Sequence, residues 1–507
     1  MPDIVNAART SSPGPERASP PWQRHERATA SDALSRGNPR IVLGICVAMG
    51  FTTLLDQAIF TMAVPRLRDG LHASPSQLQL ILSIYSVAFG VALVPAGRLG
   101  DIIGRRSLFL FGLAVFTGFS VLGGLAWSPR SIIVARLLQG LGAGIINTQV
   151  LGLIQDLFHG QARARALGHY ASAGGLSAAA GPLIGGLVLA LTPPDVGWRL
   201  LFLVNVPFGV GVFVLAWRHL PAIRPPAGRL SLDLIGLALL SVATLALMLA
   251  TLVSGTGGVP VRVWLVAAAA SLLLFVCWEV QFERRGGTAL LTRGLVRSSG
   301  YVLGTAVAMF QFAAGLTVGM VTTLFFLDGL GVRPLTFAAL SVAPALGMMV
   351  SSTQSWRFAG RFGRTGVAVA IAAYACLIAL QGGAMLALPV SGILIAYPAI
   401  GLLQGAASGL IHAPNQAMTL ADAGAGEGRG VAAGFLQLSQ RLACAIGLSW
   451  GAGIFFARLA PGASLDAYRA AFGASVALVG ALSCGALLAA IADARRRRAP
   501  AEQTHGR

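Results

Sequence analysis

The stretch GRLGDIIGRRS, residues 97–107, joins two long apolar segments and decides how the chain can fold. Its three glycines let the backbone turn tightly and neighbouring segments approach closely. Asp101 and Arg105 carry opposite charges, which can hold each other and the partial charges of nearby helix ends. The stretch therefore predicts a short polar turn between two helices, held by a charge lock. An ordinary arginine-rich loop on the cytoplasmic side of a membrane also fits it.

The composition on either side of this turn indicates an integral membrane protein. Of the 507 residues, 55% are hydrophobic and only 11% are charged, whereas charged residues make up about a quarter of a typical soluble chain. Apolar segments of roughly 20 residues, each long enough to cross a bilayer as a helix, recur along the sequence. Membrane barrels show alternating segments of ~10 residues instead. We therefore expect an all-α, multi-pass membrane protein.

We count fourteen predicted membrane spans with short polar connections. They cover residues 41–64, 78–98, 107–127, 131–156, 165–191, 199–217, 231–253, 260–280, 301–327, 336–356, 366–387, 391–418, 430–457 and 467–492. All 37 basic residues are arginines, and most of them fall in the tails and in every second loop, on the side of the N-terminus. Because basic residues are enriched in cytoplasmic loops, both termini are predicted to be cytoplasmic.

Several classes of function are disfavoured by what the sequence lacks. The net charge is +19, but no basic patch interleaves with aromatic residues, so we expect no nucleic-acid partner. The five cysteines all lie in apolar segments and form no CxxC or Cys/His cluster, so no metal site or disulfide is predicted. We find neither a catalytic pair nor a phosphate-binding loop. We therefore expect no enzyme and no cofactor.

The turn resembles the loop signature of the major facilitator superfamily, G-x-L-x-D-x-x-G-R-[RK], and lies between the second and third spans as in that superfamily. The matching residues are Gly97, Leu99, Asp101, Gly104, Arg105 and Arg106. Residues 357–364, RFAGRFGR, resemble the same signature but lack its aspartate. The resemblance implies a membrane transporter.

Four further stretches resemble motifs of the 14-helix drug:proton antiporters of this superfamily. LDQAIFTMAVP, residues 55–65, resembles the first-helix motif, although Ala58 and Thr61 depart from it. ARLLQGLGAG, residues 135–144, resembles the fourth-helix motif through Arg136, Gln139, Gly140 and Gly142. GGLSAAAGPLIGG, residues 174–186, resembles the antiporter motif of the fifth helix through Gly181, Pro182, Gly185 and Gly186. WRLLFLVNVPFG, residues 198–209, resembles the opening of the sixth helix.

The resemblance implies two six-helix bundles with a site between them at mid-membrane, and two extra helices between the bundles. The predicted parts are a disordered cytoplasmic tail (1–40), an N-terminal bundle (41–220), the two extra helices with cytoplasmic loops (221–300), a C-terminal bundle (301–492) and a cytoplasmic tail (493–507).

Asp56 is the one acidic residue well inside a predicted span. At ~1.5 Å per residue it lies about 22 Å into its helix, at the same depth as Arg136 on the fourth span. Burial favours a neutral carboxylic acid, and a nearby arginine favours the carboxylate. We predict that Asp56 carries the coupling proton and that Arg136 biases its release. The alternative is a static pair that only orients the two helices.

Other polar residues within spans are candidates for a substrate cavity. Asn147 shares a helix face with Arg136 and either lines the cavity or bonds across helices. The remaining cavity candidates lie in the C-terminal half: Gln311, Gln404, Gln437, Gln440 and Arg441. Arg441 either binds an anionic substrate group or caps a helix end, and His412 is expected to pack structurally. Asp156 is predicted to pair with Arg105 and close the cytoplasmic side.

These observations predict a monomeric, proton-coupled exporter of drugs, antibiotics or other lipophilic small molecules in the cytoplasmic (inner) membrane, in contact with lipids. The Gly181-Pro182 pair should kink the fifth helix, and in the family it marks exporters. An uptake symporter and a non-transporting membrane sensor remain as alternatives.

Overall fold

The computed structural model describes residues 38–71, 73, 75–222, 233–252, 260–287, 289–290, 292–423, 429–459 and 462–503. Every regular element within these ranges is a helix, which confirms the all-α membrane class predicted from composition. Nearly all of the predicted N-terminal tail, and the polar loop before residue 233, fall outside the described residues.

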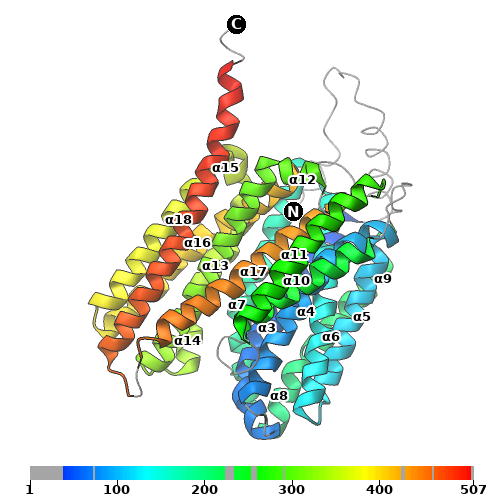
Figure 1. The fold of residues 1–507 in the computed structure, drawn as a ribbon. Coiled ribbons are helices and arrows are strands. Elements are labelled where there is room, and N and C mark those ends of the chain that lie inside the picture. The colour runs from blue at the N-terminus through cyan, green and yellow to red at the C-terminus, as the bar shows by residue number, and fades with distance from the viewer. Residues whose placement is uncertain are drawn as a thin grey trace.

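The helices form two halves that lie side by side (Figure 1). The N-terminal half consists of α3 (Pro39–Leu71), α4 (Pro75–Ile103), α5 (Arg105–Gly124), α6 (Pro129–Leu157), α7 (Gly160–Leu191), α8 (Pro194–Leu203) and α9 (Asn205–His219). The C-terminal half consists of α12 (Arg293–Arg297), α13 (Ser299–Leu324), η1 (Phe325–Gly329), α14 (Pro334–Leu340), α15 (Val342–Ala387), α16 (Val390–Asp422), α17 (Arg429–Phe456) and α18 (Leu465–Gln503).

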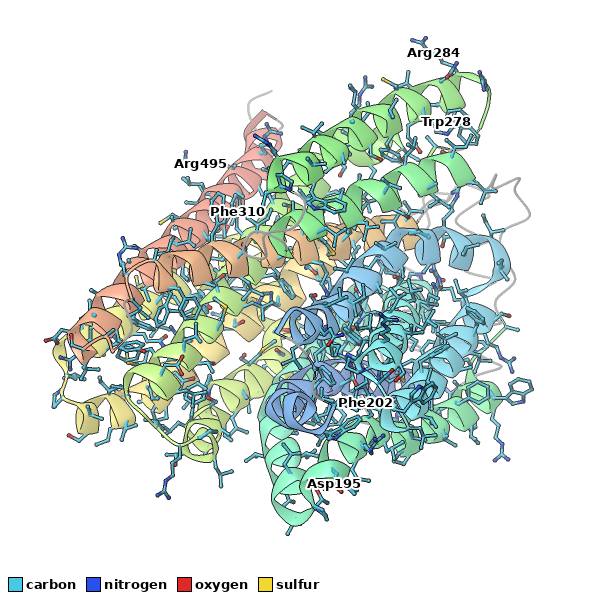
Figure 2. The ribbon with its side chains drawn as sticks, turned by 60° about the horizontal axis from the view of Figure 1, so that its bottom comes forward. Asp195, Phe202, Trp278, Arg284, Phe310 and Arg495 are labelled. Carbon is cyan, nitrogen blue, oxygen red and sulfur yellow. The ribbon has the colours of Figure 1, made fainter. Side chains whose placement is uncertain are left out.

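Two extra helices, α10 (Leu234–Leu252) and α11 (Val261–Arg284), pack against each other outside the two halves. Helix α10 contacts α4 and α17, so the pair crosses the junction between the halves on one side (Figure 1). In Figure 2, Trp278 and Arg284 mark one end of α11 at the edge of the molecule.

Twelve helical stretches of the described residues are long and apolar enough to cross a membrane. One of them, Pro334–Ala387, has 54 residues and covers two predicted spans. Gly363 interrupts it with a non-helical backbone (φ 53°) at the predicted loop. Leu234–Ala250 is a shorter apolar helix at the place of the seventh predicted span. The described helices thus accommodate fourteen spans, and the exact count stays a prediction.

Local sequence explains where the helices begin and end. The side chain of Ser128 accepts a hydrogen bond from the Ser131 amide and Ser131 bonds back to Ser128, which forms a capping box before Pro129 at the start of α6. Val204 separates α8 from α9, where a single sixth span was predicted. Pro207 has no amide hydrogen to donate to the preceding turn, which accounts for the break.

The last helix extends beyond the predicted end of its membrane span, into the predicted tail. Helix α18 continues to Gln503 instead of ending near residue 492 (Figure 1). The arginines of this segment are good helix formers, and nothing before Pro500 opposes continuation of the helix beyond the apolar part. Polarity therefore predicted the end of the span, but not the end of the helix.

Candidate functional site

Asp56 and Arg136 form a buried ion pair in the N-terminal half. Arg136 Nη1 lies 2.7 Å from Asp56 Oδ2, and the two side chains are only 3% (Asp56) and 2% (Arg136) exposed. Helix α3 provides the carboxylate and α6 the guanidinium, so the predicted meeting of these side chains at one depth is confirmed. Their predicted role in moving a proton is a separate matter and stays a prediction.

Two amides complete the surroundings of Asp56. Gln139 Nε2 donates to Asp56 Oδ1 over 3.0 Å, and Asn205 Nδ2 donates to the same oxygen over 2.6 Å. Gln139 Oε1 also accepts a hydrogen bond from Arg136 Nη1 at 3.0 Å. The carboxylate is therefore held by three donors from α6 and α9. A buried anion needs such partners to offset the loss of water.

Asn205 is a site residue that the sequence analysis did not single out. It stands at the first position of α9, after the break at Val204, and is completely buried. In the sequence, Asn205 is a single asparagine in an apolar segment whose pattern otherwise predicts one continuous helix. Without the tertiary structure, nothing linked it to a carboxylate 149 positions earlier in the chain.

Aromatic rings enclose the ion pair. The Arg136 guanidinium lies 4.0 Å from the centre of the Phe60 ring and 4.3 Å from that of Tyr85, which are cation–π distances. Ser120 accepts a hydrogen bond from Gln139 and donates one to the Phe202 carbonyl. Phe202 lies inside the N-terminal half (Figure 2). The pair is thus enclosed by side chains of its own half, where a change in its charge is costly.

The antiporter motif packs beside this pocket. A Cβ atom at Gly181 would stand 2.3 Å from the Cβ of Ala58, so α7 touches α3 two residues from Asp56. Gly181 thus faces α3 of its own half, whereas Gly168 and Gly175 of the same helix contact α15 of the other half. Helix α7 runs through Gly181, Pro182, Gly185 and Gly186 to Leu191. The kink itself stays a prediction.

The polar cavity candidates occupy the middle of their helices. Tyr170 donates a hydrogen bond of 2.9 Å to Asn147, so Asn147 bonds across helices, one of its two predicted roles. Gln311, Gln404, Gln437 and Gln440 are all buried. Gln311 is fully buried, and neither its oxygen nor its nitrogen has a hydrogen-bond partner among the described residues. His412 packs against Phe312, with ring centres 4.5 Å apart.

The turn at residues 97–107 forms the predicted charge lock. Gly104 adopts φ 101°, a left-handed conformation that favours glycine, and this lets α5 start directly after α4. Arg105 binds Asp101 at 2.9 Å and also pairs with Asp156 at the end of α6. Arg106 donates to the Trp217 carbonyl and so ties the turn to α9. The predicted contact of Asp156 with Arg105 is confirmed.

The lock reaches the other half of the molecule. The Gly430 amide donates to Asp101 Oδ2 over 3.2 Å, at the start of α17, where the positive end of the helix dipole favours an anion. A Cβ at Gly97 would stand 2.4 Å from the Gly430 carbonyl oxygen, and one at Gly434 would stand 2.8 Å from the Leu93 carbonyl oxygen. Helices α4 and α17 are therefore in backbone contact at this end.

A second pair of helices also joins the two halves. A Cβ at Gly168 would stand 2.5 Å from the Ser352 carbonyl oxygen, and one at Gly175 would stand 2.8 Å from that of Ala345. These contacts join α7 of the N-terminal half to α15 of the C-terminal half and run toward the middle of both helices. Of the two glycine-lined seams, the one between α4 and α17 lies at the end that carries the charge lock.

The C-terminal half repeats the lock with a different acid. Arg364, which follows Gly363, pairs with Asp422 at the end of α16 and with Asp493 of α18. This matches Arg105 after Gly104, with Asp493 in place of the loop aspartate that the sequence lacks. Arg364, Asp422 and Asp493 all belong to the C-terminal half. A cavity of about 400 Å³ next to Arg364 also lies within this half, away from the ion pair of Asp56.

We expect Arg364→Gln to destabilise the C-terminal half. The change leaves the buried Asp493 without its guanidinium, and the free energy of unfolding should fall by about 3 kcal/mol. Thermal unfolding of the purified protein in detergent measures this loss. Arg357→Gln, which changes an exposed arginine seven residues earlier, is the control and should melt like the wild type. Equal melting of both variants would contradict a stabilising role for the Arg364 pairs.

Comparison with known proteins identifies relatives of the chain. The family model described as Major Facilitator Superfamily matches residues 46–448. The "Probable actinorhodin transporter" of Streptomyces coelicolor is 35% identical over 430 residues, which cover 82% of this chain and 72% of that protein. The "Tetracenomycin C resistance and export protein" of Streptomyces glaucescens is 33% identical over 317 residues, which cover 62% and 57%.

Solved structures support the fold. The proton:xylose symporter XylE superposes with a TM-score of 0.62 at 14% sequence identity, over 89% of this chain and 94% of that one. At this identity the likeness concerns the arrangement of helices alone.

Proposed function

The chain belongs to the major facilitator superfamily of membrane transporters, and on this premise we propose that it exports lipophilic small molecules, antibiotics among them, in exchange for protons. The observation that carries the proposal is the buried Asp56–Arg136 pair with its amide partners. A buried, titratable carboxylate inside a transporter is costly to keep and gives a proton a place to bind.

The names of the relatives support export over uptake. They describe a probable actinorhodin transporter, a tetracenomycin C resistance and export protein, a cephamycin export protein and a multidrug resistance protein. The antiporter motif around Gly181, packed against α3 beside Asp56, agrees with this direction. We place the protein in the cytoplasmic membrane as a monomer, in contact with lipids, with both termini in the cytoplasm.

The proton acts through the charge of Asp56. As a carboxylate, Asp56 neutralises Arg136 and accepts hydrogen bonds from Gln139 and Asn205. Protonation removes that negative charge, so Arg136 keeps only the faces of Phe60 and Tyr85 and the Gln139 oxygen. The donors around the carboxyl group must then rearrange. Since these side chains lie on α3, α6 and α9, protonation changes how those helices pack.

The structure corresponds to a state that is closed at the cytoplasmic end, if the termini lie inside as proposed. The lock of Asp101 and Arg105 with Gly430, together with the glycine contacts between α4 and α17, holds that end shut. Opening toward the cytoplasm requires these contacts to part. Alternating access then moves the substrate, and the proton gradient supplies the energy without a cofactor.

The test uses energised everted membrane vesicles and a pH-reporting dye. If the protein is an antiporter, adding an exported compound should partly discharge the pH gradient, because each transported molecule returns protons across the membrane. The panel should include lipophilic cations, neutral antibiotics and weak acids. Vesicles from cells that lack the protein correct for simple permeation.

Other outcomes separate the alternatives. An uptake symporter would not discharge the gradient when substrate is added outside everted vesicles, because its protons and substrate cross the membrane in the same direction. Substrate added to intact cells would instead make the medium more alkaline. A membrane sensor would produce no substrate-dependent proton flux with any compound, and its phenotype would survive the loss of Asp56.

A further inference from the structure

Arg441 lies in the middle of α17, at the junction of the two halves. It follows the start of α17 by 12 residues, or about 18 Å at ~1.5 Å per residue. Its guanidinium lies over the ring of Phe89 on α4, with 4.1 Å between the guanidinium carbon and the ring centre. Arg441 therefore reaches from the C-terminal half across to the N-terminal half, near mid-membrane.

No carboxylate of the described residues neutralises Arg441. Three buried arginines have one: Arg105 pairs with Asp101, Arg136 with Asp56 and Arg364 with Asp493. Among the described residues, the one recorded contact of the Arg441 guanidinium is the Phe89 ring. A charged side chain at this depth costs several kcal/mol. A ring face alone contributes about 0.5–2 kcal/mol, so it does not offset that cost.

The helix face that carries Arg441 explains why this side chain is only partly buried. Gly430, Gly434, Gln437 and Arg441 follow each other at helical spacing on one face of α17. The glycines touch the backbone of α4, at Gly97 and Leu93, and close that end of the junction. Arg441 lies farther along α17 than the two glycines, and its own side chain fills the space between α17 and α4. It is only partly buried. It therefore stands where the tight seam ends.

The neighbouring groups are polar but uncharged. One turn away, Gln437 Nε2 is buried and has no hydrogen-bond partner among the described residues. The phenols of Tyr85 and Tyr170 lie within electrostatic range of Arg441. Stacking on Phe89 holds the guanidinium plane and leaves its N–H groups, which lie in that plane, free to donate. The groups around Arg441 can therefore donate hydrogen bonds beside its positive charge, and no acid among the described residues pairs with it.

We propose that Arg441 binds the anionic group of the transported molecule, and that the substrates of this protein are lipophilic organic anions such as carboxylates or sulfonates. This inference rests on the proposed export function and names its substrate class. The substrate anion supplies the missing counter-charge to Arg441, and the Gln437 amide is placed to donate a further hydrogen bond. The apolar body of the substrate fills the junction between the halves.

The test compares two fluorescent probes that share one aromatic skeleton. Anilinonaphthalene sulfonate is an anion, and phenylnaphthylamine is its neutral counterpart without the sulfonate. Binding is measured on the full chain in nanodiscs of phosphatidylcholine, so that no anionic lipid competes, with empty nanodiscs subtracted. The variants are Arg441→Gln and Arg441→Lys. Arg458→Gln, an exposed arginine just beyond α17, is the matched control.

We expect Arg441→Gln to weaken binding of the sulfonate probe about tenfold or more, since an ionic hydrogen bond is lost, and to leave the neutral probe unchanged. Arg441→Lys keeps the charge and should retain most of the affinity even if the Gln variant folds poorly. Equal loss for both probes, or no loss for either, would overturn the inference and leave export untouched. Failure of the wild type to bind or export any probe would refute the proposed function itself.

Discussion

Asp56→Asn should abolish proton-coupled export while leaving the protein folded. Asparagine keeps the shape of the side chain and one of its two acceptor oxygens, which can still accept either from Arg136 or from Gln139 and Asn205, but it cannot take up a proton in the working pH range. We expect substrate-dependent proton flux in energised vesicles to fall by about a hundredfold or more, since the coupled step has no alternative carrier. Expression and thermal stability establish that the variant is folded.

The control for this change is Asp466→Asn. Asp466 lies on α18 with 88% of its side chain exposed, and its interaction with Arg469 spans 3.4 Å. An exposed pair contributes little, so this variant should transport like the wild type. Substantial proton-coupled export by Asp56→Asn would refute the proton-carrying role and leave the ion pair as a structural link between α3 and α6.

Gly97→Ala should prevent the molecule from closing at the end that carries the charge lock. The added Cβ would lie 2.4 Å from the Gly430 carbonyl oxygen, and backbone cannot yield as a flexible side chain does. Separating α4 from α17 also pulls the Gly430 amide away from Asp101. We expect export to fall tenfold or more, which requires a shift of only about 1.4 kcal/mol between the closed and open states.

Distances between the halves measure this shift directly. Spin labels at residues 161 and 361, which are exposed on opposite halves near this end, should report longer distances in Gly97→Ala than in the wild type. Cys277, Cys376 and Cys484, the exposed cysteines, are first replaced by serine. Gly118→Ala is the matched control, because nothing lies within 4 Å of a Cβ there. Unchanged distances in Gly97→Ala would contradict the role of this seam.

The two halves show how a repeated turn acquires different tasks. In the N-terminal turn, Asp101 binds Arg105 and also accepts the Gly430 amide from the other half. In the C-terminal turn, Gly360 stands four residues before Arg364, in the place of that acid. Arg364 therefore takes its second carboxylate from Asp493 of α18, within its own half. Only the first turn, of the two described here, links the halves through its acid.

Much of the fold was predictable because the membrane restricts what a chain can do. Long apolar segments must form helices there, since backbone groups find no other hydrogen-bond partners. The turn at residues 97–107 and the pairing of Arg105 with Asp156 followed from motif and position. Element ends were less predictable: α18 outlasts its apolar part, and the sixth span divides at Val204.

Within the candidate site, only the charged residues Asp56 and Arg136 could be predicted from the sequence. A charge in an apolar span is conspicuous, and depth along two helices was enough to match Asp56 with Arg136. The amides gave no comparable signal, because an asparagine such as Asn205 is compatible with many interhelical bonds. The role of Arg441 was open between anion binding and helix capping. Its place on the Phe89 ring, in the middle of α17, removes the capping alternative.

By itself, the sequence determined that the chain is a multi-pass helical membrane protein of this superfamily, and that a carboxylate and an arginine lie deep in its N-terminal half. Hydrophobicity and local motifs act over a few turns of helix, so a sequence displays them directly. The tertiary structure decided which groups share the Asp56 pocket and which glycines touch across the halves. It also showed that Arg441 has no acidic partner within the described part of the chain. Those properties depend on contacts between helices far apart in the chain, and helical periodicity alone does not specify them.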